Sequence, residues 1–158
     1  MMIYKLNRHT MTAAQFSQLV TMEENCGLEP YSPDMLLDCI ENLDTYVCMK
    51  GETVAGFITV HPFSRKLGGG LYIVNLNVAG NYRRQGIGRA LMVSACARYR
   101  DSHAGSMVSL DVTKTNTAAL KLYQKLGFVV TDIPSSNGDT DVVMVAALER
   151  LIKENVCS

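Results

Sequence analysis

The sequence lacks the features that would place it outside the class of ordinary globular proteins. It has no tryptophan and no net charge. Only 19% of its 158 residues are charged and 47% are apolar, a composition that excludes intrinsic disorder. No apolar run approaches the roughly 20 residues needed to span a bilayer. The N-terminus also lacks the apolar stretch and cleavage site of a secretory signal. We therefore expect one cytoplasmic domain over residues 1–158 that does not bind a membrane.

The cysteines and histidines do not form a recognisable framework. The five cysteines are odd in number and no two of them form a Cys-x-x-Cys pair, while the histidines lack metal-ligand spacing. The pattern excludes a disulfide scaffold and a zinc site, so we expect a reduced protein without a metal. The residues concerned are Cys26, Cys39, Cys48, Cys96 and Cys157, and His9, His61 and His103, which are expected at the surface.

The zero net charge conceals an uneven distribution of charge. Residues 1–70 carry eight acidic and five basic side chains, whereas residues 71–158 carry seven acidic and ten basic ones. Eight of those bases fall within residues 83–125, against only Asp101 and Asp111. A local positive field in a neutral protein favours a small anionic ligand over a nucleic acid, which we do not expect as a partner.

Apolar periodicity predicts alternating strands and helices. Ser32 and Pro33 suit the N-cap and the first position of a helix. Residues 61–70 end in three glycines and predict a mobile loop. Strands are expected at 3–6, 46–49, 53–60, 71–78, 107–112, 128–133 and 141–145, and helices at about 12–26, 33–43, 86–100 and 117–126.

This order of elements predicts an α/β (mixed α+β) fold. Its twisted mixed sheet would have about six or seven strands and about four flanking helices, with helices on both faces. The C-terminal tail is amphipathic, with Leu148, Leu151, Ile152 and Val156 at helical spacing. We expect the tail either to pack on the domain or to mediate a homodimer.

The most informative segment runs from Leu76 to Leu91. A strand ends, a short loop carries Arg83 and Arg84, and two glycines open a helix, whose free N–H groups suit a phosphate. A Walker A loop is excluded because Gly88 is not followed by Lys and Ser or Thr. A dinucleotide fingerprint is excluded because its third glycine is missing.

Two motifs, one in this segment and one further along the chain, resemble those of the GNAT superfamily, the acyl-CoA-dependent N-acyltransferases. Arg83-Arg84-Gln85-Gly86-Ile87-Gly88 matches the R/Q-x-x-G-x-G/A motif. Downstream, residues 116–128 look like the second motif, N-x-x-A-x-x-x-Y-x-x-x-G-F, in the expected order and separated by a strand. The resemblance covers nearly the whole chain and implies a GNAT-like sheet with splayed central strands.

The resemblance also implies how acetyl-CoA, the acyl donor, would bind without a metal. The pantetheine arm would pair with the strand backbone at Leu76, Asn77 and Val78, and the Val78 N–H would polarise the thioester carbonyl. Asn116 would bind the pantetheine or pyrophosphate region, cap its own helix, or do both. Tyr123 would protonate the leaving thiolate. The pyrophosphate would lie on the loop and first helical turn, at Arg83, Arg84, Gln85, Gly86, Ile87 and Gly88, with Arg89 either a further phosphate contact or a surface residue.

The general base is less well defined by the sequence. Asp111 is the first candidate, because it stands where the ribosomal-protein N-terminal acetyltransferases of this family carry a glutamate. A structural role for Asp111 is the alternative, and its shorter side chain favours an intervening water. Glu23 and Glu24 are second candidates for the base, and solvent is a further alternative. Both glutamates stand at the end of the first helix, where the resemblance places the acceptor site.

The resemblance therefore implies an N-acetyltransferase that uses acetyl-CoA. Such an enzyme is an acyltransferase for groups other than aminoacyl groups. The acceptor would be a primary amine of a small molecule, peptide or protein. The alternative from another class is a non-catalytic regulatory module that binds acyl-CoA without turnover.

Overall fold

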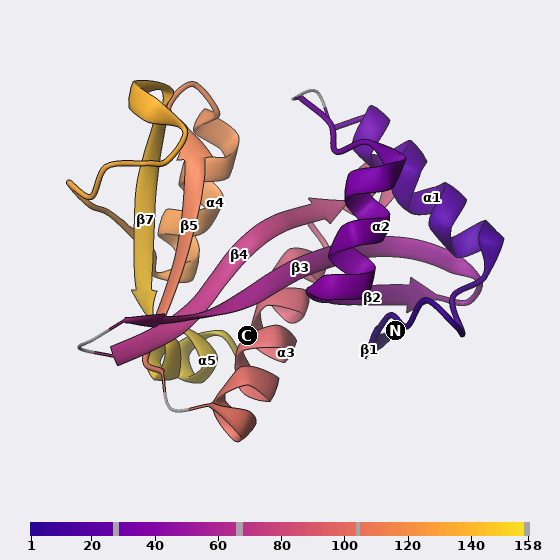
Figure 1. Cartoon of the computed structure of the whole chain (residues 1–158), viewed down its shortest axis with the longest axis horizontal. Helices are drawn as coiled ribbons and strands as arrows, with labels where there is room; N and C mark the ends of the chain where they lie inside the picture. The colour runs from indigo at the N-terminus through magenta and orange to yellow at the C-terminus, as the bar shows by residue number, and fades with distance from the viewer. Residues whose placement is uncertain (27–28, 66–67, 104, 157–158) are drawn as a thin grey trace. The chain divides into compact units, whose positions relative to one another are not determined.

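The computed structural model describes residues 1–26, 29–65, 68–103 and 105–156. In these ranges it contains a mixed sheet of order β1-β2-β3-β4-β5-β7-β6, in which β4 and β5 are parallel (Figure 1). The elements are β1 (Met2–Lys5), α1 (Ala13–Glu24), α2 (Pro33–Asn42), β2 (Asp44–Lys50), β3 (Thr53–Arg65), β4 (Gly68–Val78), α3 (Ile87–Ser102), β5 (Met107–Thr113), α4 (Thr117–Leu126), β6 (Val129–Val130), β7 (Asp141–Ala147) and α5 (Leu148–Val156), with 3-10 turns at Gly80–Tyr82 and Gly138–Thr140.

The predicted fold class is confirmed, with three corrections. The expected loop at 61–70 is wrong where it is described, because β3 runs to Arg65 and β4 begins at Gly68. Residues 66–67 of that segment and Cys157 lie outside the described ranges. The strand expected at 128–133 shortens to Val129–Val130, and the tail adds a fifth α-helix.

Contacts divide the chain into two compact units. The first comprises Met1–His61 and Val74–Ala95, and the second comprises Pro62–Ile73 and Cys96–Ser158. Strands β3 and β4 and helix α3 therefore each contribute residues to both units.

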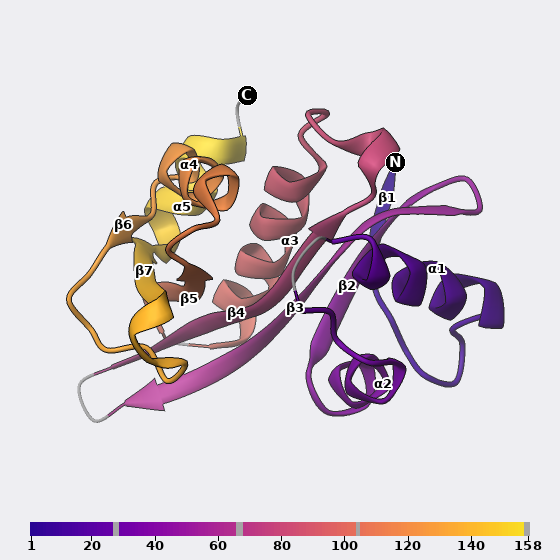
Figure 2. The same cartoon turned by 90° about the horizontal axis from the view of Figure 1, so that it is seen from above.

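In the first unit, α1 and α2 lie on one face of β2 and β3 (Figure 2). Helix α1 begins with a reciprocal capping box between Thr12 and Gln15, which satisfies two otherwise unpaired backbone N–H groups. Helix α2 begins as predicted, with Ser32 as N-cap and Pro33 in the first turn. A buried apolar cluster joins these elements, formed by Leu6, Leu19, Met22, Leu36, Ile40, Val47, Met49, Val54 and Phe57.

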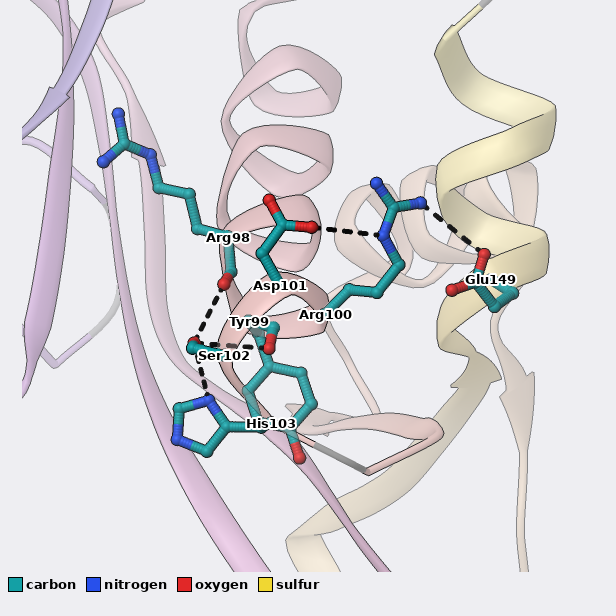
Figure 3. A network of polar contacts seen from close by, with 7 residues as sticks. All are labelled: Arg98, Tyr99, Arg100, Asp101, Ser102, His103 and Glu149. Carbon is teal, nitrogen blue, oxygen red and sulfur yellow. Dashed lines mark hydrogen bonds and ion pairs between the residues drawn. The ribbon is translucent and has the colours of Figure 1, made fainter.

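In the second unit, β5 pairs antiparallel with β7 over its whole length. The apolar side chains Leu148, Leu151 and Ile152 of α5 are buried, so the amphipathic tail packs on its own unit. An ion pair of 3.6 Å between Arg100 of α3 and Glu149 of α5 joins the two helices at the surface (Figure 3). Because both side chains are well exposed, that pair adds little to stability.

The parallel ladder between β4 and β5 requires a glycine. It pairs Gly70, Leu71 and Tyr72 with Met107, Val108 and Ser109. A Cβ at Gly70 would lie 2.2 Å from the Met107 carbonyl oxygen and 2.7 Å from the Phe63 ring. The glycines that suggested a loop are therefore part of the sheet.

We expect Gly70→Ala to lower the free energy of unfolding by about 1–3 kcal/mol, because the new methyl group must displace backbone. Urea denaturation measures this change. The matched control is Gly80→Ala, since a Cβ at Gly80 meets nothing within 4 Å. A Gly70→Ala protein as stable as the control would contradict the close approach.

Candidate functional site

The end of β4 is held in place by close packing in the first unit. Gly56 of β3 has no side chain, and a Cβ there would lie 3.0 Å from the Asn77 carbonyl oxygen and 3.1 Å from the side chains of Ile87 and Leu91. Strands β3 and β4 and the start of α3 therefore approach more closely than any other residue at this position would allow. This packing fixes where β4 ends, at Leu76, Asn77 and Val78.

The turn from Arg83 to Gly88 carries two left-handed residues before α3 begins. Arg84 has φ +62°, which is uncommon for a residue with a side chain, and Gly86 has φ +80°. The Gly86 carbonyl accepts the first helical hydrogen bond, from the Ala90 N–H at 3.0 Å. The N–H groups of the residues before Ala90 have no partner within their own helix, so the turn presents backbone donors to an anion.

Positive side chains surround this turn. Arg83 and Arg84 are exposed, and in the described ranges neither pairs with a carboxylate; the Arg83 Nε donates to the Val78 carbonyl at 3.2 Å. Lys50 also lies here, with its Nζ 3.3 Å from the Gln85 side-chain oxygen and 5.6 Å from the centre of the Tyr82 ring. A phosphate would therefore meet positive charge without having to displace a carboxylate.

Arg89 and Gly88 extend the same surface along the first turn of α3. The Nε of Arg89 is buried and has no hydrogen-bond partner in the described part of the chain. An unsatisfied buried donor is costly unless something outside the chain accepts from it. A Cβ at Gly88 would lie 3.7 Å from the Val78 side chain, so this glycine leaves the space beside β4 open. These residues fit a phosphate-bearing ligand.

Helix α4, in the second unit, carries the other motif residues. The Asn116 side-chain oxygen accepts from the Ala119 N–H at 3.2 Å, which confirms the predicted capping role. Tyr123 packs edge-on against Phe128, with ring centres 5.7 Å apart. Burial raises the pKa of Tyr123 to about 12, so its phenol keeps its proton at neutral pH.

Asp111 lies half-buried on β5 and already has two hydroxyl partners. The Tyr72 hydroxyl donates to its Oδ1 at 3.0 Å, and the Ser135 hydroxyl donates to its Oδ2. Ser135 in turn accepts from the Asn137 N–H at 3.1 Å. Asp111 therefore joins β4, β5 and the segment between β6 and β7, a set of contacts compatible with either a base or a structural anchor.

The second candidates for the base have very different surroundings. Glu24 is exposed, whereas Glu23 is buried, with 3% of its surface accessible. Both oxygens of Glu23 accept hydrogen bonds from amide donors, on Asn75 at 2.7 Å and on Asn77 at 2.8 Å. The predicted site residues thus fall into two groups: Glu23 and residues 76–89 in the first unit, and Asp111, Asn116 and Tyr123 in the second.

The sequence did not single out Lys50, Tyr72 or Ser135. Their only signal is position: Lys50 ends β2, Tyr72 shares the strand of the pantetheine segment, and Ser135 begins a turn. None of these patterns is specific. The three histidines are exposed as expected. Across the ranges described, no group of three or more His, Cys, Asp or Glu residues is placed to hold a metal, and no helix combines the length and apolar character needed to cross a membrane.

Sequence comparison places these motifs in a known family. The sequence model of the acetyltransferase (GNAT) family matches residues 11–128. The chain is 34% identical over 119 residues to N-alpha-acetyltransferase 30 of Xenopus laevis, covering 73% of this chain and 42% of that protein. It is 37% identical over 57 residues to an N-alpha-acetyltransferase of Sulfurisphaera tokodaii, covering 36% of this chain and 34% of that protein. The chain thus spans less than half the length of these relatives.

Solved structures share the fold at lower identity. The ribosomal-protein-S18-alanine N-acetyltransferase of Escherichia coli matches with a TM-score of 0.68 and 19% identity, over 93% of this chain and 94% of that one. A chain of the NatC complex bound to Gag peptide and CoA matches at 0.69 and 23%, over 93% and 99%. The aminoglycoside 6'-N-acetyltransferase of Enterococcus faecium matches at 0.74 and 17%, over 94% and 97%. At these identities the likeness establishes the fold alone.

Proposed function

The chain belongs to the GNAT acetyltransferase family, and from this premise we propose that it transfers the acetyl group of acetyl-CoA to a primary amine. The observation that carries the proposal is the turn from Arg83 to Gly88, where left-handed backbone, free N–H groups and unpaired arginines meet. The buried Nε of Arg89 supports it, because this donor lacks an acceptor within the described chain.

Each unit would supply distinct chemical roles. In the first unit, the turn binds the pyrophosphate, while the β4 backbone at Leu76–Val78 binds the pantetheine arm and the Val78 N–H stabilises the charge that develops on the thioester oxygen. In the second unit, Tyr123 donates its proton toward the leaving thiolate. Asp111 accepts the proton of the acceptor amine, directly or through water.

We propose the α-amine of a peptide or protein as the acceptor class. The two relatives named above are N-alpha-acetyltransferases, and one structural neighbour was solved with a bound peptide. A small-molecule amine is the rival, because an aminoglycoside acetyltransferase shares the fold equally well. Neutral pH leaves an amine largely protonated, so either acceptor requires a base.

Release of free thiol from acetyl-CoA tests the proposal, measured with a panel of N-terminal peptides, lysine peptides and small amines. Turnover that depends on one class of amine supports the enzyme and identifies the acceptor. Tight acetyl-CoA binding without turnover on any member of the panel would favour the alternative, a non-catalytic acyl-CoA-binding module.

We expect Gly88→Glu to abolish acetyl-CoA binding, because the new carboxylate would occupy the phosphate site and repel its charge. Calorimetry on the folded variant measures the change. Arg83→Ala and Arg84→Ala should weaken binding less, since the backbone N–H groups remain. Unchanged affinity in Gly88→Glu would remove the pyrophosphate assignment.

We expect Asp111→Asn to lower kcat/KM by roughly 10²–10⁴-fold and to remove the acidic limb of its pH profile. Acetyl-CoA affinity should stay nearly constant, because Asp111 contacts no phosphate in this proposal. Ser135→Ala is the control: it removes one hydroxyl partner of the carboxylate but leaves the carboxylate itself, so the acidic limb should persist. If Asp111→Asn retains the limb, the proton goes to another group or to solvent.

We expect Tyr123→Phe to lower kcat by about 10–10³-fold, a loss of roughly 1.4–4 kcal/mol of transition-state stabilisation. The ring and its contact with Phe128 remain, so folding and acetyl-CoA affinity should survive. Because the pKa of Tyr123 is raised to about 12, the phenol loses its proton only at a higher pH than an ordinary tyrosine does. The wild-type kcat should therefore show no basic limb from this group below about pH 11. A stable Tyr123→Phe protein with unaltered kcat, when chemistry is rate-limiting, would make the hydroxyl incidental.

A further inference from the structure

Glu23 occupies an electrostatically unfavourable position in the first unit. It lies in the last turn of α1, where the helix dipole disfavours a negative charge and where the helix has no basic residue. Its side chain is also buried, and in the part of the chain that is described it has no cationic partner. Burying a carboxylate without a cation is costly, and an apolar residue of similar size would avoid that cost.

Three N–H donors satisfy the Glu23 carboxylate, and they come from two segments distant in sequence. The Asn75 and Asn77 side chains of β4 donate to it at 2.7 Å and 2.8 Å, and the Tyr31 backbone N–H donates at 3.4 Å. The Asn77 amide nitrogen also donates to the Met22 carbonyl at 3.2 Å, which fixes the orientation of that amide. Both carboxylate oxygens therefore act as acceptors.

The two segments that Glu23 joins have different tasks in the proposed reaction. Asn75 and Asn77 flank Leu76 on β4, and Val78, the proposed oxyanion donor, follows directly. Tyr31 precedes the N-cap of α2 and lies in the segment after α1, where the family resemblance places the acceptor site. The Tyr31 hydroxyl also reaches the Val74 carbonyl, at 3.5 Å, and so makes a second link to β4.

We propose that Glu23 is a positioning residue, which holds the donor-binding part of β4 and the segment at Tyr31 in a fixed relation. The inference rests on the proposed function, because it assigns those two segments to the acyl donor and the acceptor. With both oxygens bound by amides inside the unit, Glu23 acts through Asn75, Asn77 and Tyr31 and does not serve as the base.

We call the hydrogen bonds of Glu23 to Asn75, Asn77 and Tyr31 the clamp. An exchange of the carboxylate and the amide between positions 23 and 75 tests it. Glu23→Gln alone turns one acceptor into a donor that faces an amide donor, and Asn75→Asp alone sets two carboxylates against each other. The double variant Glu23→Gln/Asn75→Asp restores one carboxylate, one amide and the hydrogen bond between them. Glu52→Gln is the matched control, since it removes the same charge from an exposed turn.

Hydrogen exchange supplies a readout that does not depend on activity. We expect Glu23→Gln to speed exchange of the backbone amides at Tyr31 and 75–78 by about 10-fold or more. The double variant should restore most of the protection at 75–78. The Tyr31 N–H donates to the same Glu23 oxygen as Asn75 and stays without that acceptor in the double variant, while the Tyr31 hydroxyl keeps its contact to the Val74 carbonyl. Glu52→Gln should leave these amides unchanged. Unaltered exchange in Glu23→Gln would overturn the clamp, whatever the activity of the protein.

Steady-state kinetics then distinguishes positioning from chemistry. We expect Glu23→Gln to lower kcat about 10-fold or more while the KM for acetyl-CoA changes less than about 3-fold, because the Arg83–Gly88 turn is intact. The double variant should return kcat to within about 3-fold of wild type. Restored protection with kcat still low would assign Glu23 to the chemistry and overturn the positioning role. A wild-type protein without turnover on any amine would count against the proposed function alone.

Discussion

The alternation of side chains along β4 is the constraint on which the first unit depends. Successive residues of a strand face opposite sides, so Asn75 and Asn77 reach the Glu23 carboxylate while Leu76 and Val78 lie near Gly88 at the start of α3. A slip of one residue would bring leucine against the carboxylate and asparagine against the helix. Polar pairing on one face and close packing on the other therefore fix the same register.

That register determines where the strand ends and so where the turn from Arg83 to Gly88 begins. The turn is constrained at both ends, by the Arg83 contact to the Val78 carbonyl and by the helical hydrogen bond of Gly86. Arg84 between them adopts a left-handed conformation without being glycine. Such a conformation persists only where its surroundings enforce it, so the backbone donors are arranged before any ligand arrives.

Sequence patterns predicted the elements that local chemistry determines. Ser32 and Pro33 begin α2, and α4 runs from Thr117 to Leu126, as their caps and apolar spacing indicate. The prediction of a loop at 61–70 was wrong because glycine occurs for two different reasons. Turns often require glycine, but Gly70 instead permits the close approach of β5. Local spacing cannot distinguish these two uses.

The candidate site was predictable to the same degree and for the same reason. The two motifs lie on continuous segments, so their order and spacing could be recognised directly. The contacts of Glu23 with Asn75 and Asn77 join residues more than 50 positions apart, and Tyr72 meets Asp111 across 39 positions. Such pairs depend on which strands become neighbours, and no periodicity within either segment carries that information. The sequence alone therefore could not show that the Glu23 carboxylate accepts hydrogen bonds from two asparagine side chains.

Asn116 shows how folding and ligand binding can require different things of one side chain. Its oxygen caps α4 by accepting from Ala119, while in the part of the chain described here its amide nitrogen makes no hydrogen bond. Aspartate, serine or threonine would start the helix about as well. An aspartate, however, would replace the free donor with a second acceptor and add a negative charge. The helix alone therefore does not require an amide at this position: a change to another good cap would preserve α4 and remove only the N–H donor of Asn116.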